Sequence, residues 1–286
     1  MKLNSLHILL TYQCNYECDH CFVWGSPQQS GIFTLNRLEN VFQQALMVGS
    51  IDELYFEGGE TFIYYPILVK AVRRANQLGF RTGIVSNGYW AVSVEDGRFW
   101  LEPLLRAGLD KLEISVDPLH GSTIVSDHPG LLAAKELGLA ATALVTDHNE
   151  HQDDVMYRGR AAVKLTNGRP RKPWDSFTHC PYENLVEPDR IHLDPFGNLH
   201  LCQGIVIGNL WQRSLLDILT EFQPDIHPIA GPIITGGPSQ LVKQYQLPHQ
   251  AGYVDACHLC YTARTTLRKQ FPAELAPDQM YGVLVK

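Results

Sequence analysis

The sequence has no apolar run long enough to cross a membrane and no block of basic residues. A membrane-spanning helix needs about 20 mostly apolar residues, so we expect no membrane protein. Nucleic acids and anionic membranes are bound largely through lysine and arginine, so neither is expected as the main partner. The N-terminal segment is too short and polar for a secretory signal, and a cytoplasmic protein is expected.

The composition that remains is that of a globular protein. The chain has 286 residues, of which 45% are hydrophobic, and a formal net charge of −7 from 23 basic and 30 acidic residues. This length permits one large domain or a barrel with a smaller module. Seven cysteines is an odd number, and clustered cysteines in a cytosolic protein indicate a metal site or catalysis.

The first half of the chain alternates short apolar runs with segments of helical periodicity. Strands are predicted at 5–10, 53–56, 81–85, 111–116 and 141–145, and helices at 35–48, 66–78, 98–107 and 132–137. This alternation predicts an α/β fold with parallel strands, whose chemistry lies at the carboxyl ends of the strands. Only about a dozen residues separate Val145 from the next motif at Tyr157, so we expect a truncated, partial barrel.

The character of the sequence changes after about residue 165. Residues 169–173 form a basic linker, and the turn residues at 194–198 predict a β-hairpin over 190–202. Residues 224–250 hold many prolines and glycines and are expected to form a long loop, and a basic helix is expected at 263–271. We therefore predict a first domain at 1–165 and a second, smaller module at 166–286.

Three cysteines near the N-terminus carry most of the functional information. Cys14, Cys18 and Cys21 have the spacing C-x₃-C-x₂-C. Three thiolates so close can hold three irons of a [4Fe–4S] cluster and leave the fourth iron open, because such clusters normally take four cysteine ligands. A zinc site or chance is the alternative, although structural zinc prefers four protein ligands and no fourth cysteine is near in sequence.

Polar motifs follow three of the predicted strands. They are Gly58-Gly59-Glu60, Ser86-Asn87-Gly88 and Ser115-Val116-Asp117. Paired glycines let a backbone approach a ligand closely, and the polar side chains offer hydrogen bonds. Taken singly, each motif is about equally well explained by a tight turn or a helix cap.

The other four cysteines lie in the second half of the chain. They are Cys180, Cys202, Cys257 and Cys260. Four thiolates suffice to ligate every iron of a second [4Fe–4S] cluster. Structural zinc is the main alternative, and buried free thiols or a redox disulfide are lesser ones.

Together these motifs resemble those of the radical S-adenosylmethionine (SAM) superfamily, in the family's order. The resemblance implies that SAM takes the open iron through its amino and carboxylate groups. It also implies contacts of SAM with His20, Gly58, Gly59, Glu60, Ser86, Asn87, Ser115 and Asp117. Thr61 replaces the proline of the family's Gly-Gly-Glu-Pro turn, which loosens the match slightly. The four C-terminal cysteines resemble the Twitch module, a short form of the SPASM extension, and imply a second cluster.

Residues 157–161 resemble the Gly-Arg-Ala element found near the end of the barrel in many relatives. The resemblance implies that Arg158 or Arg160 binds a carboxylate or hydroxyl-rich substrate, or helps a proton to leave. A surface ion pair is the alternative explanation for either arginine.

The resemblance implies a radical oxidoreductase. A flavodoxin- or ferredoxin-type reductant would supply an electron, SAM would be cleaved to a 5′-deoxyadenosyl radical, and that radical would abstract a hydrogen from a small polar substrate. The second cluster would then accept an electron, which completes a dehydrogenation. The architecture is similar to that of the 2-deoxy-scyllo-inosamine dehydrogenases of aminocyclitol synthesis. The alternatives are a peptide maturase, a radical epimerase or rearrangement enzyme, and a non-enzymatic iron–sulfur sensor.

Overall fold

The computed structural model describes residues 3–121, 124–148 and 154–284. The chain divides into two compact units that interleave along the sequence. The N-terminal unit comprises Asn4–Tyr16 and Gly25–Asp154, and the C-terminal unit comprises Met1–Leu3, Glu17–Trp24 and Val155–Lys286. These units are defined by which residues pack together and do not by themselves establish domains. The predicted domains 1–165 and 166–286 therefore stay a prediction.

The N-terminal unit is built on parallel strands. They are β1 (Ser5–Thr11), β2 (Glu53–Gly58), β3 (Arg81–Ser86), β4 (Lys111–Ser115) and β5 (Ala140–Leu144), in the order β5-β4-β3-β2-β1. Each neighbouring pair of these strands is parallel. No closed barrel is present among the described residues, and the predicted α/β class with a truncated parallel sheet is confirmed.

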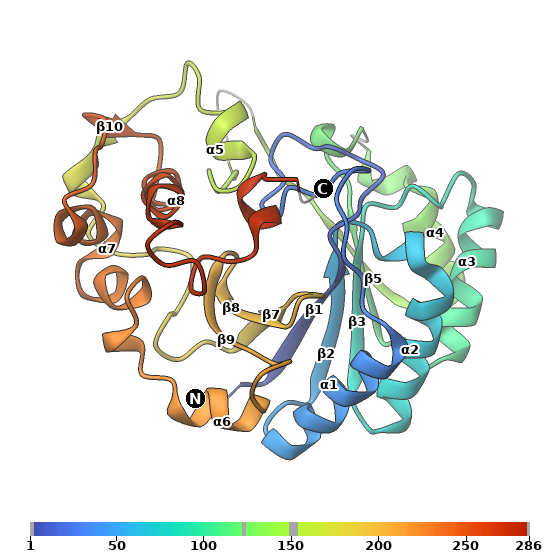
Figure 1. Cartoon of the computed structure of the whole chain (residues 1–286). Coiled ribbons are helices and arrows are strands. Elements are labelled where there is room, and N and C mark those ends of the chain that lie inside the picture. Colours follow the sequence, from blue (N-terminus) through green and yellow to red (C-terminus); the bar gives the residue numbers. More distant parts are fainter. Residues whose placement is uncertain (1–2, 122–123, 149–153, 285–286) are drawn as a thin grey trace. The chain divides into compact units, whose positions relative to one another are not determined.

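Helices follow the strands as predicted and lie together along one face of this sheet (Figure 1). They are α1 (Leu35–Val48), the 3₁₀ helix η1 (Thr61–Tyr64), α2 (Tyr65–Gln77), α3 (Val94–Arg106) and α4 (Pro129–Glu136), with short 3₁₀ turns η2 (Pro118–His120) and η3 (Val125–Asp127). Helix α3 starts earlier than predicted because the Ser93 side chain caps it, accepting a hydrogen bond from the Asp96 N–H at 3.0 Å. Residues such as Leu38, Phe42 and Leu101 fill the core.

The C-terminal unit contains the predicted hairpin, formed by antiparallel strands β7 (Arg190–Leu193) and β8 (Asn198–Cys202). A third strand, β9 (Ile205–Asn209), pairs with β8 and was not predicted. Two short strands, β6 (Lys172–Pro173) and β10 (Gly252–Tyr253), form a separate pair. The remaining elements here are α5 (Ala161–Lys164), the 3₁₀ helix η4 (Trp174–Ser176), α6 (Leu215–Glu221) and the 3₁₀ helix η6 (Asp278–Tyr281).

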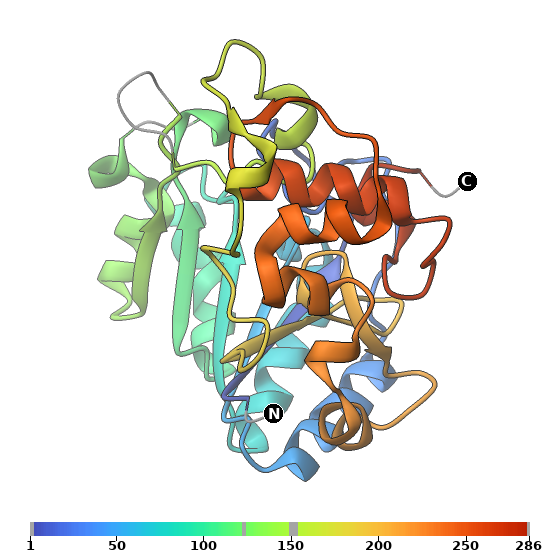
Figure 2. The same cartoon turned by 90° about the vertical axis from the view of Figure 1, so that its left-hand side faces the viewer.

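The prediction of a long loop at 224–250 is wrong. The segment forms the 3₁₀ helix η5 (Pro224–Ile226) and α7 (Ala230–Tyr245), which packs beside α8 (Ala256–Leu267), as Figure 2 shows. Helix α7 breaks at Gly236 and Gly237, which have non-helical backbone angles, and resumes at Pro238. Proline suits the first turn of a helix, where its missing N–H has no partner to lose.

Helix α8 begins earlier than the predicted 263–271. The Asp255 side chain caps it by accepting a hydrogen bond from the His258 N–H at 2.7 Å. Cys257 therefore stands in the first turn of a helix, and Cys260 stands at the start of its second turn. Among the described residues, no helix is both long and apolar enough to span a membrane.

Candidate functional site

Glu60 organises the carboxyl ends of β2 and β3. Its side chain is fully buried and accepts hydrogen bonds from Ser86 Oγ at 2.9 Å, from the Asn87 N–H at 2.7 Å and from the Phe62 N–H at 3.0 Å. Burial raises the pKa of Glu60 to about 7, although the hydrogen bonds from Asn87, Phe62 and Ser86 lower it. The carboxylate is therefore turned into the protein, where it positions the turn that follows β3.

The glycines before Glu60 lie against the chain that leads to Cys14. The Gly59 N–H donates to Thr11 O at 2.7 Å, and the Glu60 N–H donates to Gln13 O at 2.9 Å. A Cβ on Gly59 would lie 2.1 Å from Gln13 O, so no larger residue fits this position without a backbone shift. Thr61, which stands where the family has proline, is buried and donates through Oγ1 to Val85 O at 3.4 Å.

Asn87 brings its side-chain amide to the first cysteine. Its Nδ2 lies 3.7 Å from Cys14 Sγ and donates to Asn15 Oδ1 at 2.9 Å. The Tyr16 N–H also points to Cys14 Sγ, at 3.4 Å. Two N–H groups are therefore aimed at the sulfur of a predicted ligand of the first cluster.

Ser115 and Asp117 lie at the end of β4. Ser115 is half-buried and is the last residue of that strand. Asp117 is buried, caps η2, and accepts hydrogen bonds from the N–H and the Nδ1 of His120, each at 3.0 Å. The N-terminal unit thus brings Cys14, Gly58, Gly59, Glu60, Ser86, Asn87, Ser115 and Asp117 to the carboxyl ends of its strands.

Cys18, His20 and Cys21 belong to the C-terminal unit, where each is half-buried. Arg160 holds their loop, because its Nη1 donates to Cys18 O at 2.7 Å and its backbone N–H donates to Cys21 O at 2.9 Å. The same guanidinium lies 5.3 Å from the centre of the Trp24 ring. Arg160 is thus engaged with the cysteine loop, and its predicted role at a substrate stays a prediction.

The four C-terminal cysteines line one cavity. Cys180 comes from the segment before β7, Cys202 ends β8, and Cys257 and Cys260 lie in α8. About 420 Å³ of space, part of it open to solvent, lies among the lining side chains. Side chains three residues apart on a helix share a face, so α8 presents Cys257 and Cys260 together.

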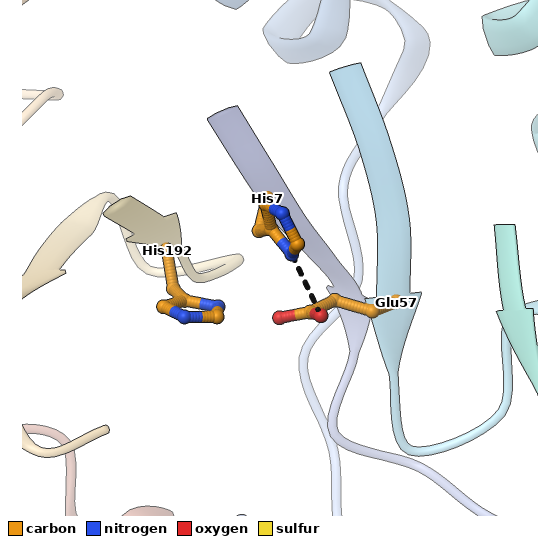
Figure 3. Close-up of side chains that lie close together, drawn as sticks. All are labelled: His7, Glu57 and His192. Carbon is orange, nitrogen blue, oxygen red and sulfur yellow. Dashed lines mark hydrogen bonds and ion pairs between the residues drawn. The ribbon is translucent and has the colours of Figure 1, made fainter. Parts of the chain in front are cut away.

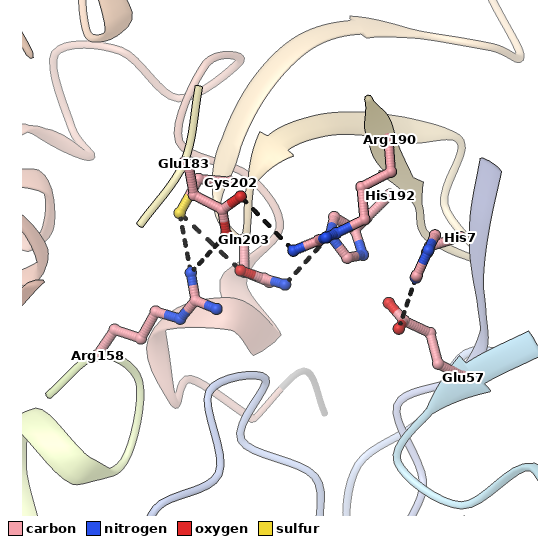
Figure 4. A network of polar contacts seen from close by, with 8 residues as sticks. All are labelled: His7, Glu57, Arg158, Glu183, Arg190, His192, Cys202 and Gln203. Carbon is pink, nitrogen blue, oxygen red and sulfur yellow. Dashed lines mark hydrogen bonds and ion pairs between the residues drawn. The ribbon is translucent and has the colours of Figure 1, made fainter. Parts of the chain in front are cut away.

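Two buried arginines complete the lining of this cavity. Arg158 Nη1 lies 3.3 Å from Cys202 Sγ and 3.4 Å from Glu183 Oε1 (Figure 4). Gln203, the residue after Cys202, places its Nε2 3.4 Å from His192 Nε2. Arg264 on α8 is 1% exposed. In the described part of the chain, the Nε atoms of Arg158 and Arg264 find no hydrogen-bond acceptor. Four thiols with two guanidinium groups suit an anionic iron–sulfur cluster, whose sulfides are acceptors for such donors.

Burial also controls the thiols of this cavity. It raises the pKa of Cys180, of Cys257 and of Cys260, the last to about 11. These thiols are therefore protonated at neutral pH when no metal is bound, and metal binding must release their protons.

The comparisons with known proteins agree with this arrangement. Residues 8–120 match the model of the Radical SAM superfamily. The chain carries a radical SAM domain. Members of this superfamily use a [4Fe–4S] cluster and SAM, so this domain implies both, and the predicted resemblance is confirmed.

Curated relatives match the chain over part of their length. The "putative peptide biosynthesis protein YydG" of Bacillus subtilis is 24% identical over 126 residues, which are 44% of this chain and 40% of that protein. A "probable GTP 3′,8-cyclase" of Methanothermobacter marburgensis is 33% identical over 122 residues, which are 42% of this chain and 37% of that protein. The chain thus spans well under half the length of these relatives.

A solved structure shows the same fold over more of the chain. The crystal structure of BtrN in complex with AdoMet and 2-DOIA is similar with a TM-score of 0.52 at 15% identity. It covers 76% of this chain and 81% of the BtrN chain. The likeness therefore reaches beyond the radical SAM domain, which ends its match at residue 120.

Sequence analysis did not predict two residues that line the four-cysteine cavity, or one ion pair of the parallel sheet. Arg264 lies in a segment that was predicted only as a basic helix, and Glu183 belongs to no recognised motif. In the N-terminal unit, His7 Nδ1 lies 3.1 Å from Glu57 Oε2 (Figure 3). The His7 ring also stacks on the Tyr55 ring. Alternation in adjacent strands β1 and β2 places His7 and Glu57 on one face, a signal that pairing the predicted strands would have given.

Proposed function

We propose that the chain is a radical SAM dehydrogenase that oxidises a small polar substrate and uses a second [4Fe–4S] cluster. Cys14, Cys18 and Cys21 would ligate the first cluster. Cys180, Cys202, Cys257 and Cys260 would ligate the second. When bound, the first cluster with SAM supplies a 5′-deoxyadenosyl radical, and the second supplies a one-electron acceptor.

One observation carries this proposal: four cysteines from three separate segments line a single cavity. A closed cluster with four thiolate ligands has no open iron for a substrate, so its use is electron transfer. The dehydrogenation then balances as one hydrogen atom lost to the radical, one electron to the second cluster and one proton to a base. The likeness to the fold of BtrN, a structure that holds AdoMet and 2-DOIA, supports the same architecture.

The residues of the N-terminal unit would hold SAM. The Gly58–Gly59 turn packs against the Thr11–Gln13 backbone that leads to Cys14, and Asn87 and Ser115 stand at the ends of neighbouring strands of the same sheet. Glu60 would act from within, because its buried carboxylate fixes the Ser86–Asn87 turn. Asp117 would accept from the ribose hydroxyls. His20, from the C-terminal unit, would lie beside the adenine.

A peptide substrate is the second candidate. The match to the peptide biosynthesis protein YydG favours it, although that match covers 44% of this chain. A peptide-modifying enzyme would use the same radical, so SAM cleavage alone does not separate the two candidates. The substrate that donates its hydrogen decides between them.

The test counts iron and sulfide in anaerobically reconstituted protein. We expect about two [4Fe–4S] clusters in the wild type and one in the Cys14→Ala/Cys18→Ala/Cys21→Ala variant, because the C-terminal cysteines retain theirs. The Cys257→Ser/Cys260→Ser variant should keep the first cluster, which Cys14, Cys18 and Cys21 ligate. If the triple variant holds zinc or no metal, the second cluster and its role as electron acceptor are wrong.

A second measurement separates the candidates. Wild type with SAM and dithionite should form 5′-deoxyadenosine, and the triple variant should form none. If the protein is an iron–sulfur sensor, neither protein should form it.

Deuterated cyclitols and deuterated peptides would then be offered in turn. Deuterium recovered in 5′-deoxyadenosine from a cyclitol supports the dehydrogenase, and recovery only from a peptide supports the maturase.

A further inference from the structure

Arg264 is a buried cation whose charge is not balanced by any carboxylate in the described part of the chain. Its side chain is 1% exposed and lines the four-cysteine cavity. Its Nη1 donates to Gln203 O at 2.7 Å and lies 3.5 Å from the Tyr281 hydroxyl, and both partners are neutral. The rings of Tyr261 and Tyr281 lie 5.8 Å and 5.9 Å from the guanidinium carbon.

A charge in this position is costly unless an anion lies near it. Removing a guanidinium from water costs free energy, and proteins recover it through a nearby counter-charge. Arg264 follows Cys260 by four residues on α8, so both side chains share one face of the helix. The cavity is therefore the place where its counter-charge would lie.

The other arginine of the cavity is already paired. Arg158 lies 3.4 Å from Glu183 Oε1, and Glu183 also lines the cavity. The side chains of Arg158 and Glu183 are 6% and 13% exposed, and Glu183 Oε2 also lies 3.7 Å from Nη2 of the more exposed Arg190, so one carboxylate serves both arginines. Arg264 is thus the arginine of the cavity that has no carboxylate partner among the described residues.

We propose that Arg264 is the fixed counter-charge of the second iron–sulfur cluster and raises its reduction potential, so that the cluster accepts an electron. This inference rests on the proposed function, because it needs that cluster. A cluster with four thiolate ligands is an anion, and reduction adds one electron and no proton to it. A buried positive charge stabilises the reduced form more than the oxidised form, and hydrogen bonds to the sulfurs act in the same direction.

The test is an anaerobic redox titration followed by electron paramagnetic resonance. The full chain is used with Cys14, Cys18 and Cys21 changed to Ala, so that the signal comes from the second cluster. Arg264→Gln should lower the equilibrium constant for reduction at least tenfold, which is 59 mV for a one-electron couple. Arg264→Lys keeps the charge and should restore most of the potential, which a merely structural role does not predict.

Two further variants test the sign and the place of the effect. Glu183→Gln removes a negative charge and should raise the potential, and this exchange keeps the shape of the side chain if Arg264→Gln fails to fold. Arg213→Gln removes an arginine of the same unit whose side chain is 48% exposed, and it should leave the potential unchanged.

The outcomes distinguish this inference from the proposed function. If the triple cysteine parent takes up no iron and sulfide, the proposed second cluster does not exist. If the parent holds a cluster but Arg264→Gln leaves its potential unchanged, or Glu183→Gln lowers it, the counter-charge assignment is wrong and the proposed function stands.

Discussion

The carboxylate of Glu60 accepts a hydrogen bond of 2.7 Å from the backbone N–H of Asn87, which joins the end of β2 to the turn after β3. The same carboxylate receives Ser86 Oγ. It thus connects two of the motifs that the sequence shows as separate turns. Ionisation of this carboxyl group should therefore change the free energy of unfolding of the N-terminal unit.

Glu60 should make stability depend on pH in an unusual direction. Its pKa is raised from 4.5 to about 7 by burial, so the folded state disfavours the charged form. The contribution of protonated Glu60 to the free energy of unfolding is fully present below about pH 4.5. It falls by about 3 kcal/mol as the pH rises through about 7. Urea unfolding of wild type and Glu60→Gln at several pH values measures this, since Gln does not titrate. A difference between them that stays constant with pH would contradict the assignment.

Gly59→Ala should damage the site next to Cys14. The new Cβ would lie 2.1 Å from Gln13 O, so the backbone must move, and we expect a loss of about 1–3 kcal/mol in stability and a large loss of 5′-deoxyadenosine formation. Gly49→Ala is the control. Gly49 has a φ of 76° with nothing within 4 Å of its Cβ, so the variant should lose about 1 kcal/mol and keep SAM cleavage. Equal effects of the two variants on SAM cleavage would refute the close-approach argument.

Gly237→Ala should lower occupancy of the four-cysteine cavity. Gly237 has a φ of 69°, and its Cβ would lie 2.3 Å from His179 N, next to Cys180. In the triple cysteine variant, we expect the Gly237→Ala exchange to leave less than half of the iron that the proposed second cluster otherwise holds. Gly236→Ala is the neighbouring comparison, because the φ of Gly236 is −162° and its Cβ would lie 2.9 Å from Gln240 Cβ, a milder contact than the 2.3 Å contact of Gly237 with the backbone. That variant should retain its iron.

Arg160→Ala should weaken the first cluster. It removes the 2.7 Å hydrogen bond to Cys18 O and the contact with the Trp24 ring, so the Cys18–Cys21 loop loses its support. We expect faster loss of iron from the first cluster on chelation, followed by optical absorption. Lys164→Ala removes an exposed charge from the same short helix α5 and serves as the control. If both variants lose iron at the wild-type rate, Arg160 does not support the loop.

Local patterns predicted the parts of the fold that local physics controls. The strands of the parallel sheet follow from apolar runs, and the hairpin follows from the turn residues Asp194–Asn198, where Asp194 Oδ1 accepts from the Phe196 N–H. The strand-end rule also placed Glu60 and Asn87 at the same edge. It did not predict that the Glu60 carboxylate points inward, because this depends on how Ser86 and Phe62 present their donors.

Residues whose environment is set by tertiary packing were not predictable. Helix α7 contains Gly236, Gly237 and Pro238, a composition typical of loops, and it is helical because its apolar residues pack against other elements of the unit. Arg264 lies in a segment with other basic residues, and the sequence does not say which of them faces inward. Its burial emerges only when α8 is placed beside Cys202.

The short segment Glu17–Trp24 belongs to the C-terminal unit although the chain on both sides of it belongs to the other. Trp24 Nε1 donates to the Tyr261 hydroxyl at 2.8 Å, a bond between residues 237 positions apart. An evolutionary exchange of the C-terminal module between relatives would therefore not be a clean fusion at one point. Trp24, Arg160 and Tyr261 would have to change together, so relatives that differ in the C-terminal unit should also differ in the Glu17–Trp24 segment.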